Sequence, residues 1–217
     1  MRPLDNMESY AYGMWPVVLI HVAIFIFFVL SFLKPRKRWE WRSMGVFSAF
    51  VIALFTEMYG FPLTIYILLS LFGSNYPALD PFSHASGNLW AAFLGDLEYL
   101  SGFLMFAGTV VIIAGFVVMG AAWKRIHNAK GKIVTTGLYG WVRHPQYSAL
   151  FLIMVGTLIQ WPTIITLAML PVLFLMYYRL ARREEREAAS QFGEEYISYT
   201  RRVPMFIPGL RSQDLSQ

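Results

Sequence analysis

The sequence predicts an all-α fold: a polytopic membrane helical bundle of five transmembrane helices followed by a C-terminal cytoplasmic helix. Hydrophobic residues make up 57% of the 217 residues and charged residues only 14%, whereas a typical soluble domain has about 25% charged residues. The apolar residues gather in runs of roughly the 20 residues that a helix needs to cross a bilayer. All Lys and Arg residues lie outside these runs, and no strand-like alternation interrupts the runs.

The first half of the chain supplies three of the predicted spans. Residues 14–33 form the first apolar run. Residues 44–72 form the second, which is longer than one crossing needs. We expect either one helix kinked near Pro62 or two pieces that meet there, because proline interrupts a helix. Residues 98–122 form the third run.

The fourth and fifth spans lie in residues 147–178, which are interrupted at Gln160-Trp161-Pro162. Because this interruption is only a few residues long, we expect the two helices to form a tight antiparallel hairpin.

The positions of the basic residues test this division. Segments 34–42, 123–146 and 179–217 hold 17 of the 18 Lys and Arg residues, whereas loop 73–97 holds none and contains Asp80 and Asp96. Five crossings place all three basic segments on one side, so the positive-inside rule puts the N-terminus outside and the C-terminus in the cytoplasm. Four crossings, with 44–72 re-entrant, would separate the first basic segment from the others. We expect an integral protein of a bacterial or archaeal inner membrane, or its equivalent.

Composition also excludes several kinds of chemistry. The chain has no cysteine, which excludes catalytic thiols, thiolate metal sites and iron–sulfur clusters. The four histidines show no metal-ligand spacing, so no metal is predicted. Nothing in the charge pattern indicates a nucleic-acid partner, whereas membrane lipids are expected partners.

A polar segment at 123–146 differs from a generic loop. Glycines punctuate it, and it ends in Arg143-His144-Pro145, with Tyr147 following. Proline restricts the residue before it to an extended conformation, so a rigid turn would present an Arg and a His at the start of a helix. Such a turn is a plausible anion clamp. The alternative is a basic loop that lies on anionic lipid headgroups, and this alternative suits the lysines best.

The residues after the last span form a second polar cluster. Much of it can be explained as a solvated helix face with i,i+4 charge pairs. Glu184 is the exception, because it continues a face that is otherwise apolar. This position indicates a polar pocket. Phe192-Gly193 then predicts a helix end, since glycine is favoured just beyond a C-cap.

Glu57 is the one carboxylate deep in a predicted span. An ionisable residue inside a membrane is a candidate functional group. The alternative is a structural, hydrogen-bonded glutamate at the kink, and the sequence favours neither.

Residues 131–147, GKIVTTGLYGWVRHPQY, are followed by a hydrophobic hairpin, by Arg-Arg-Glu-Glu and by Phe192-Gly193-Glu194-Glu195-Tyr196. In order and spacing, these blocks resemble the isoprenylcysteine carboxyl methyltransferase family and its phospholipid methyltransferase relatives. The resemblance covers about 120–206 and implies an integral-membrane enzyme that uses S-adenosyl-L-methionine (SAM). It divides the chain into a three-span region at 1–122, which would determine the substrate, and a cofactor-binding region at 123–217.

The resemblance also implies site residues. The expected cofactor-binding positions are Lys132, Ile133, Val134, Tyr139, His144, Pro145, Tyr147 and Glu184. Arg143 is added to them because its charge suits the SAM carboxylate. A histidine or arginine suits the SAM carboxylate, and a glutamate or aromatic ring suits its cationic groups. The chain departs from the family at Leu180, where prenylcysteine methyltransferases carry an arginine for the substrate carboxylate. Arg179 and Arg183 lie nearby and, with Glu57, are the catalytic candidates.

Several acceptors remain open. The family default is carboxyl O-methylation of a prenylcysteine-like compound, and the acceptor would be a lipophilic or small molecule that is accessible from the membrane. Methylation of a phospholipid amine or of a thiol is the alternative within the class. A degenerate membrane scaffold or transporter subunit is the alternative outside it.

Overall fold

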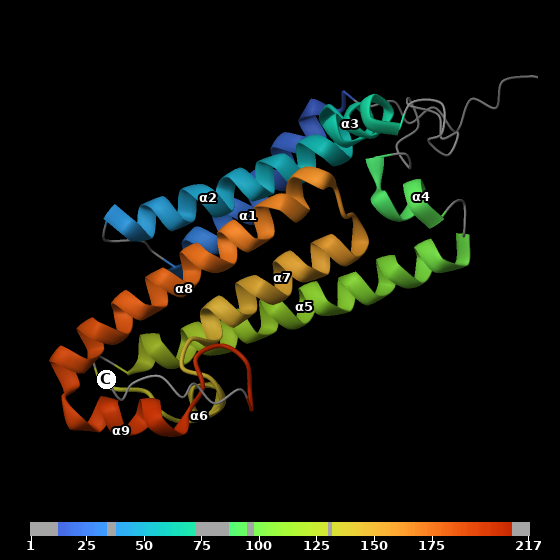
Figure 1. Ribbon diagram of the computed structural model, residues 1–217. Coiled ribbons are helices and arrows are strands. Elements are labelled where there is room, and N and C mark those ends of the chain that lie inside the picture. The colour runs from blue at the N-terminus through green and yellow to red at the C-terminus, as the bar shows by residue number, and fades with distance from the viewer. Residues whose placement is uncertain (1–12, 34–37, 73–86, 95–97, 130–131, 210–217) are drawn as a thin grey trace, which may run out of the picture. The chain divides into compact units, whose positions relative to one another are not determined.

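The computed structural model describes residues 13–33, 38–72, 87–94, 98–129 and 132–209 (Figure 1). Every regular element of these residues is a helix, which confirms the predicted all-α class. The basic residues at 34–37, the acidic residues Asp80 and Asp96, and the tail from 210 lie outside the described residues. The α-helices are α1 (Trp15–Leu33), α2 (Arg38–Phe55), α3 (Leu63–Phe72), α4 (Leu89–Leu94), α5 (Glu98–Asn128), α6 (Leu138–Trp141), α7 (Pro145–Gln160), α8 (Ile164–Phe192) and α9 (Glu194–Arg202).

The chain forms two compact units. The first consists of residues 1–109 and 157–173, and the second of residues 110–156 and 174–217. Helices α5, α7 and α8 each contribute residues to both units. The polar segment at 132–144, which we call the strap, belongs to the second unit. So do Glu184 and Glu185, which we call the acidic turn of α8.

Four of the described helices are long and apolar enough to cross a membrane: α1, α2 with the turn that follows it, α5 and α8. Helix α7 has only 16 residues, about 24 Å at 1.5 Å per residue, which is shorter than a hydrocarbon core of about 30 Å. The all-helical membrane protein is therefore confirmed, but five crossings are not. Helix α8 has 29 residues, so the polar cluster after the predicted last span continues the same helix.

The second apolar run consists of two helical pieces. Helix α2 passes into a π-helical turn, η1 (Thr56–Gly60), and α3 begins at Leu63. Phe61 has an extended backbone with φ −129° and ψ 114°, as expected for a residue that precedes proline. Of the two interpretations left open by the sequence, the structure has two pieces that meet at Phe61-Pro62.

Within the second unit, α5 and α7 approach closely through a small residue. A side chain at Gly115 would place its Cβ 2.7 Å from Cγ1 of Ile153 and 3.0 Å from the backbone oxygen of Ala149. Helix α8 ends at Phe192, and Gly193 follows with a positive φ of 59°. The predicted helix end is therefore confirmed, and this turn leads into α9, which lies beside α6 (Figure 1).

Candidate functional site

The strap contains one turn that only glycine can form. Gly137 has φ 64° and ψ −127°, a combination that side-chain-bearing residues rarely adopt. A Cβ at this position would also lie 2.3 Å from Cζ of Arg125, because the Arg125 guanidinium rests against the glycine. The turn leads into the four-residue helix α6 and then into extended backbone at Val142.

The extended end of the strap pairs with the chain that follows α9. The backbone N–H of Arg143 donates to the oxygen of Pro204 at 2.8 Å, and the N–H of His144 donates to the oxygen of Met205 at 3.0 Å. Ser148 adds a hydrogen bond from its hydroxyl to the oxygen of Phe206 at 2.7 Å. Ser148 thus anchors the C-terminal segment to the first turn of α7.

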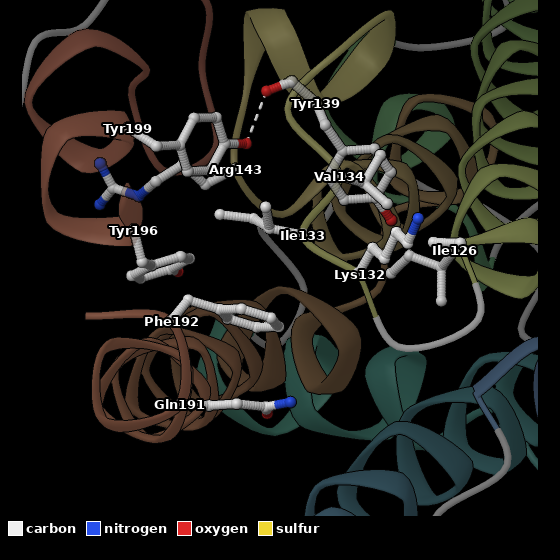
Figure 2. A pocket seen from close by; sticks show the side chains of 11 residues that line it. Ile126, Lys132, Ile133, Val134, Tyr139, Arg143, Gln191, Phe192, Tyr196 and Tyr199 are labelled. Atoms are coloured by element: carbon white, nitrogen blue, oxygen red, sulfur yellow. Dashed lines mark hydrogen bonds between the residues drawn. The ribbon is translucent and has the colours of Figure 1, made fainter. Parts of the chain in front are cut away.

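A pocket of about 310 Å³ lies between the strap, the C-terminal ends of α5 and α8, and α9. Figure 2 shows Tyr196 and Tyr199 of α9 on one side, Lys132 and Ile126 on the other, and the last residues of α8 below. Its lining residues are Ile126, Ala129, Lys132, Ile133, Val134, Tyr139, Arg143, Gln191, Phe192, Tyr196 and Tyr199. The lining is therefore largely aromatic and aliphatic, with few polar groups, as is typical of small-molecule sites.

Tyrosines hold the strap and α9 together at this pocket. The Tyr199 hydroxyl donates to the backbone oxygen of Tyr139 at 2.6 Å (Figure 2). The hydroxyl of Tyr139 itself is buried and has no hydrogen-bond partner among the described residues. Burial, with a smaller contribution from the nearby Tyr199 and Glu184, raises the pKa of Tyr139 well above its usual value. Tyr139 therefore keeps its proton and can donate it in a hydrogen bond.

Arg143 joins the pocket to a buried ion pair. Its Nε lies 2.6 Å from Oε1 of Glu185, and both side chains are almost fully buried. Its Nη1 donates to the backbone oxygens of Thr200 at 2.9 Å and Val203 at 2.6 Å. The guanidinium thus binds α8 and the end of α9 at once.

His144 lies between two neighbouring carboxylates. Its Nδ1 is 3.4 Å from Oε2 of Glu184, and its Nε2 is 3.3 Å from Oε1 of Glu185. The hydroxyl of Tyr147 donates to Oε1 of Glu184. Burial alone would lower the pKa of His144, but hydrogen bonds and charge interactions with the two glutamates outweigh it and raise the pKa. The protonated imidazole can donate to both carboxylates, whereas the neutral ring can donate to only one.

The cofactor-binding residues predicted from the sequence fall into two adjacent groups. Lys132, Ile133, Val134, Tyr139 and Arg143 line the pocket. His144, Tyr147 and Glu184 form the hydrogen-bonded cluster. Pro145 is buried as the first residue of α7, where proline suits a helix start.

The three catalytic candidates predicted from the sequence do not line this pocket. Arg179 and Arg183 are exposed on α8 and do not line the pocket. Glu57 belongs to the first unit, in the π-helical turn η1, and is only 2% exposed. Its Oε2 accepts the backbone N–H of Thr64 at 3.0 Å, while Oε1 has no hydrogen-bond partner among the described residues. Thr64 in turn accepts the N–H of Ile164, the first residue of α8, at 3.1 Å.

Sequence reasoning missed Glu185 and the tyrosines of α9. A signal for Glu185 is present in hindsight, since Tyr177 and Ala181 precede it at four-residue spacing and both are buried. Such a row of apolar and small residues marks a packed helix face, which makes the glutamate on it the buried one. Glu184, which the sequence favoured, has a side chain that is 37% exposed.

A comparison with known families points to this part of the chain. The sequence profile of the isoprenylcysteine carboxyl methyltransferase family matches residues 101–190. The protein-S-isoprenylcysteine O-methyltransferase of Mus musculus is 35% identical over 81 residues, which are 36% of this chain and 28% of that protein. The chain thus spans little more than a quarter of this relative.

Two further relatives match longer stretches. Protein-S-isoprenylcysteine O-methyltransferase B of Arabidopsis thaliana is 24% identical over 179 residues, which are 71% of this chain and 91% of that protein. The nickel-cobalt-cadmium resistance protein NccN of Alcaligenes xylosoxydans xylosoxydans is 30% identical over 118 residues, 53% of this chain and 54% of that protein. Residues 101–190, which include the strap, α7 and the acidic turn of α8, are thus similar to the isoprenylcysteine carboxyl methyltransferase family.

Proposed function

We propose that the protein is an integral-membrane, SAM-dependent methyltransferase that acts on a lipophilic or small acceptor accessible from the membrane. The observation that carries the proposal is the pocket of about 310 Å³, because four of its lining residues, Lys132, Ile133, Val134 and Tyr139, are ones that the family motif assigns to the cofactor. Arg143, which also lines it, has a charge that suits the SAM carboxylate. The acceptor we favour is the carboxylate of a prenylcysteine-like compound. An amine of a phospholipid and a thiol are the alternative acceptors.

The residues of the pocket suit the chemical groups of SAM. The aromatic rings of Tyr139, Tyr196 and Phe192 offer faces for an adenine ring and for a cationic sulfonium. The buried Tyr139 hydroxyl, which has no partner among the described residues, offers a hydrogen bond. Lys132 is exposed at the pocket and suits a carboxylate. We assign Lys132, Ile133, Val134, Tyr139 and Arg143 to the cofactor site, and His144, Pro145, Tyr147 and Glu184 to the wall beside it.

The bound cofactor would supply an activated methyl group on its sulfonium. Methyl transfer by direct displacement requires alignment of the reactants and exclusion of water more than a strong base. The protein meets these needs with a mostly apolar lining and with the strap, which the C-terminal segment fixes in place.

We place the determinants of acceptor choice in the N-terminal region, residues 1–122, and in the exposed arginines Arg179 and Arg183 of α8. Glu57 is a candidate contact for an amine or thiol acceptor, because a carboxylate acceptor would not need it. The charge pattern favours an N-terminus outside the membrane and a C-terminus in the cytoplasm.

Calorimetry with SAM on the purified, folded protein tests the proposal. We expect saturable binding to the wild type. We expect weaker binding to His144→Ala and Glu184→Ala, with thermal unfolding still cooperative. If SAM does not bind to demonstrably folded wild-type protein, the enzyme proposal fails and a membrane scaffold or transporter subunit is favoured instead.

The acceptor can be found by mass spectrometry. Lipid extracts are incubated with the protein and with SAM that carries a deuterated methyl group. A mass increase on a carboxylate, an amine or a thiol then identifies which of the three acceptors is used.

A further inference from the structure

We propose that Arg143 and Glu185 are positioning residues, which hold α9 as a wall of the pocket instead of contacting the cofactor themselves. The inference deepens the proposed function, because it concerns the same pocket. It differs from the contact with the SAM carboxylate that the charge of Arg143 suggested, and it gives a role to Glu185, for which the motif resemblance predicted none.

The hydrogen-bond donors of Arg143 are directed toward α8 and the end of α9. Nε is bound to Glu185, and Nη1 donates to the backbone oxygens of Thr200 and Val203. The last carbonyls of a helix have no partner within the helix. Arg143 therefore supplies the missing donors at the end of α9, and its positive charge also suits a helix C-terminus.

Helix α9 forms one wall of the pocket. Tyr196 and Tyr199 line it, and together with Val203 they form a buried cluster that packs on Ile133 and Phe192. Helix α9 has only nine residues, and an isolated helix of this length is not stable in water. Its position must therefore come from tertiary contacts, and the guanidinium makes two of them.

The ion pair between Arg143 and Glu185 is buried. The side chains of Arg143 and Glu185 are 2% and 6% exposed, so the pair is removed from solvent. A buried ion pair often adds little net stability, but removing one partner is costly because it strands the other charge. Such a pair is suited to fixing one arrangement of two segments, here α8 and the end of α9.

Hydrogen exchange of the cofactor-free protein tests this proposal without requiring activity. We compare the wild type with Arg143→Lys, which keeps the charge but loses the planar group that reaches several oxygens at once. We expect the amides of residues 194–205 to exchange at least tenfold faster in Arg143→Lys, and SAM to bind at least tenfold more weakly. Arg186→Lys is the matched control, since Arg186 is exposed next to Glu185, and we expect wild-type exchange and binding.

Two results would overturn the proposal. If Arg143→Lys binds SAM weakly while residues 194–205 exchange as in the wild type, Arg143 contacts the cofactor directly. If neither quantity changes, the arginine is not needed to hold α9. Should the wild type itself fail to bind SAM, the proposed function falls, and the exchange rates alone still decide whether Arg143 holds α9.

A second variant tests the same role if Arg143→Lys fails to fold. Arg143→Met with Glu185→Leu removes both charges of the pair, and His144 keeps Glu184 as its carboxylate partner, so no charge is left buried and unpaired. We expect this double variant to unfold cooperatively and to show the same fast exchange in residues 194–205. Wild-type exchange in a folded double variant would contradict the positioning role.

Discussion

Tyr139 shows how a single residue can serve the ligand more than the fold. Its hydroxyl is buried without a partner among the described residues, and a buried polar group without a hydrogen bond lowers stability. We expect Tyr139→Phe to leave the thermal midpoint unchanged or slightly raised, and to weaken SAM binding by roughly 2–13-fold, the equivalent of about 0.5–1.5 kcal/mol for one hydrogen bond. Calorimetry and thermal unfolding measure the two quantities. A large loss of stability with intact binding would assign the hydroxyl to the fold instead.

His144 makes the pocket wall sensitive to pH. Its pKa is raised above the ordinary 6.5 by Glu184 and Glu185 despite burial. Among the described residues, Arg143 and Arg182 pair with Glu185, and the rings of Tyr147 and Phe206 pack against the imidazole. A raised pKa stabilises the folded state below pH 6.5, and this contribution is lost as the pH rises through the folded-state pKa. We expect the thermal midpoint to fall as the pH is raised above about 6.5.

His144→Gln is the control for this pH dependence, because glutamine keeps one hydrogen-bond donor but does not titrate in this range. Its thermal midpoint should be lower at pH 6 and should change less between pH 6 and 9. An equal slope in wild type and variant would show that another group is responsible.

At the scale of elements, the strap depends on the turn at Gly137. Alanine there would force a residue with a Cβ into a conformation that costs about 1–3 kcal/mol, and it would displace the Arg125 guanidinium. We expect Gly137→Ala to lower the free energy of unfolding by about that amount and to weaken SAM binding. Adding Arg125→Ala relieves the contact but not the backbone strain, so the loss should be only partly restored.

Gly120→Ala is the matched control for the strap. Gly120 lies within α5, and a Cβ there meets nothing within 4 Å. Alanine should therefore be neutral or slightly stabilising, since it is the better helix former. Equal effects of the two substitutions in unfolding experiments would contradict the argument from the turn.

Glu57 lies in the π-helical turn between α2 and α3. Its carboxylate accepts the N–H of Thr64 near the start of α3, as an N-capping group does. We expect Glu57→Gln to keep the thermal midpoint, because the amide oxygen can still accept this hydrogen bond. Glu57→Leu should cost about 1–3 kcal/mol, the penalty for a buried unsatisfied donor.

Turnover of Glu57→Gln then tests the acceptor role separately. If Glu57→Gln is folded and its turnover is unchanged, Glu57 does not contact the acceptor, and its role is to cap the start of α3. Loss of turnover at an unchanged thermal midpoint would support contact with an amine or thiol. A lower thermal midpoint for Glu57→Gln than for Glu57→Leu would contradict the capping role of Glu57.

The sequence predicted the elements that depend on local properties. The apolar runs predicted the long helices, Gly193 the end of α8, and Pro62 the break in the second run. The predicted residues from Lys132 to Arg143 line one pocket because the motif is contiguous. The Arg143–Glu185 pair and the hydrogen bond from Tyr199 to Tyr139 join residues 42 and 60 positions apart. Such contacts are set by tertiary packing, which periodicity does not encode.

At the scale of the whole molecule, the number of crossings decides on which side each basic segment lies. Contacts within the second unit already link the strap to α8, since Arg143 pairs with Glu185 and His144 lies 3.4 Å from Glu184. The strap and the acidic turn of α8 therefore lie on the same side of the membrane. What differs between five crossings and four, with 44–72 re-entrant, is the side on which Arg42 lies.

The absence of cysteine makes this question easy to test, because single cysteines can be introduced without removing any. We choose Arg42→Cys, Thr136→Cys and Arg186→Cys, since all three positions are exposed. Five crossings with a cytoplasmic C-terminus predict that a membrane-impermeant thiol reagent labels none of them in intact cells and all of them in inside-out vesicles. Labelling of Arg42→Cys alone from outside would establish four crossings, because only a re-entrant 44–72 separates that position from the strap.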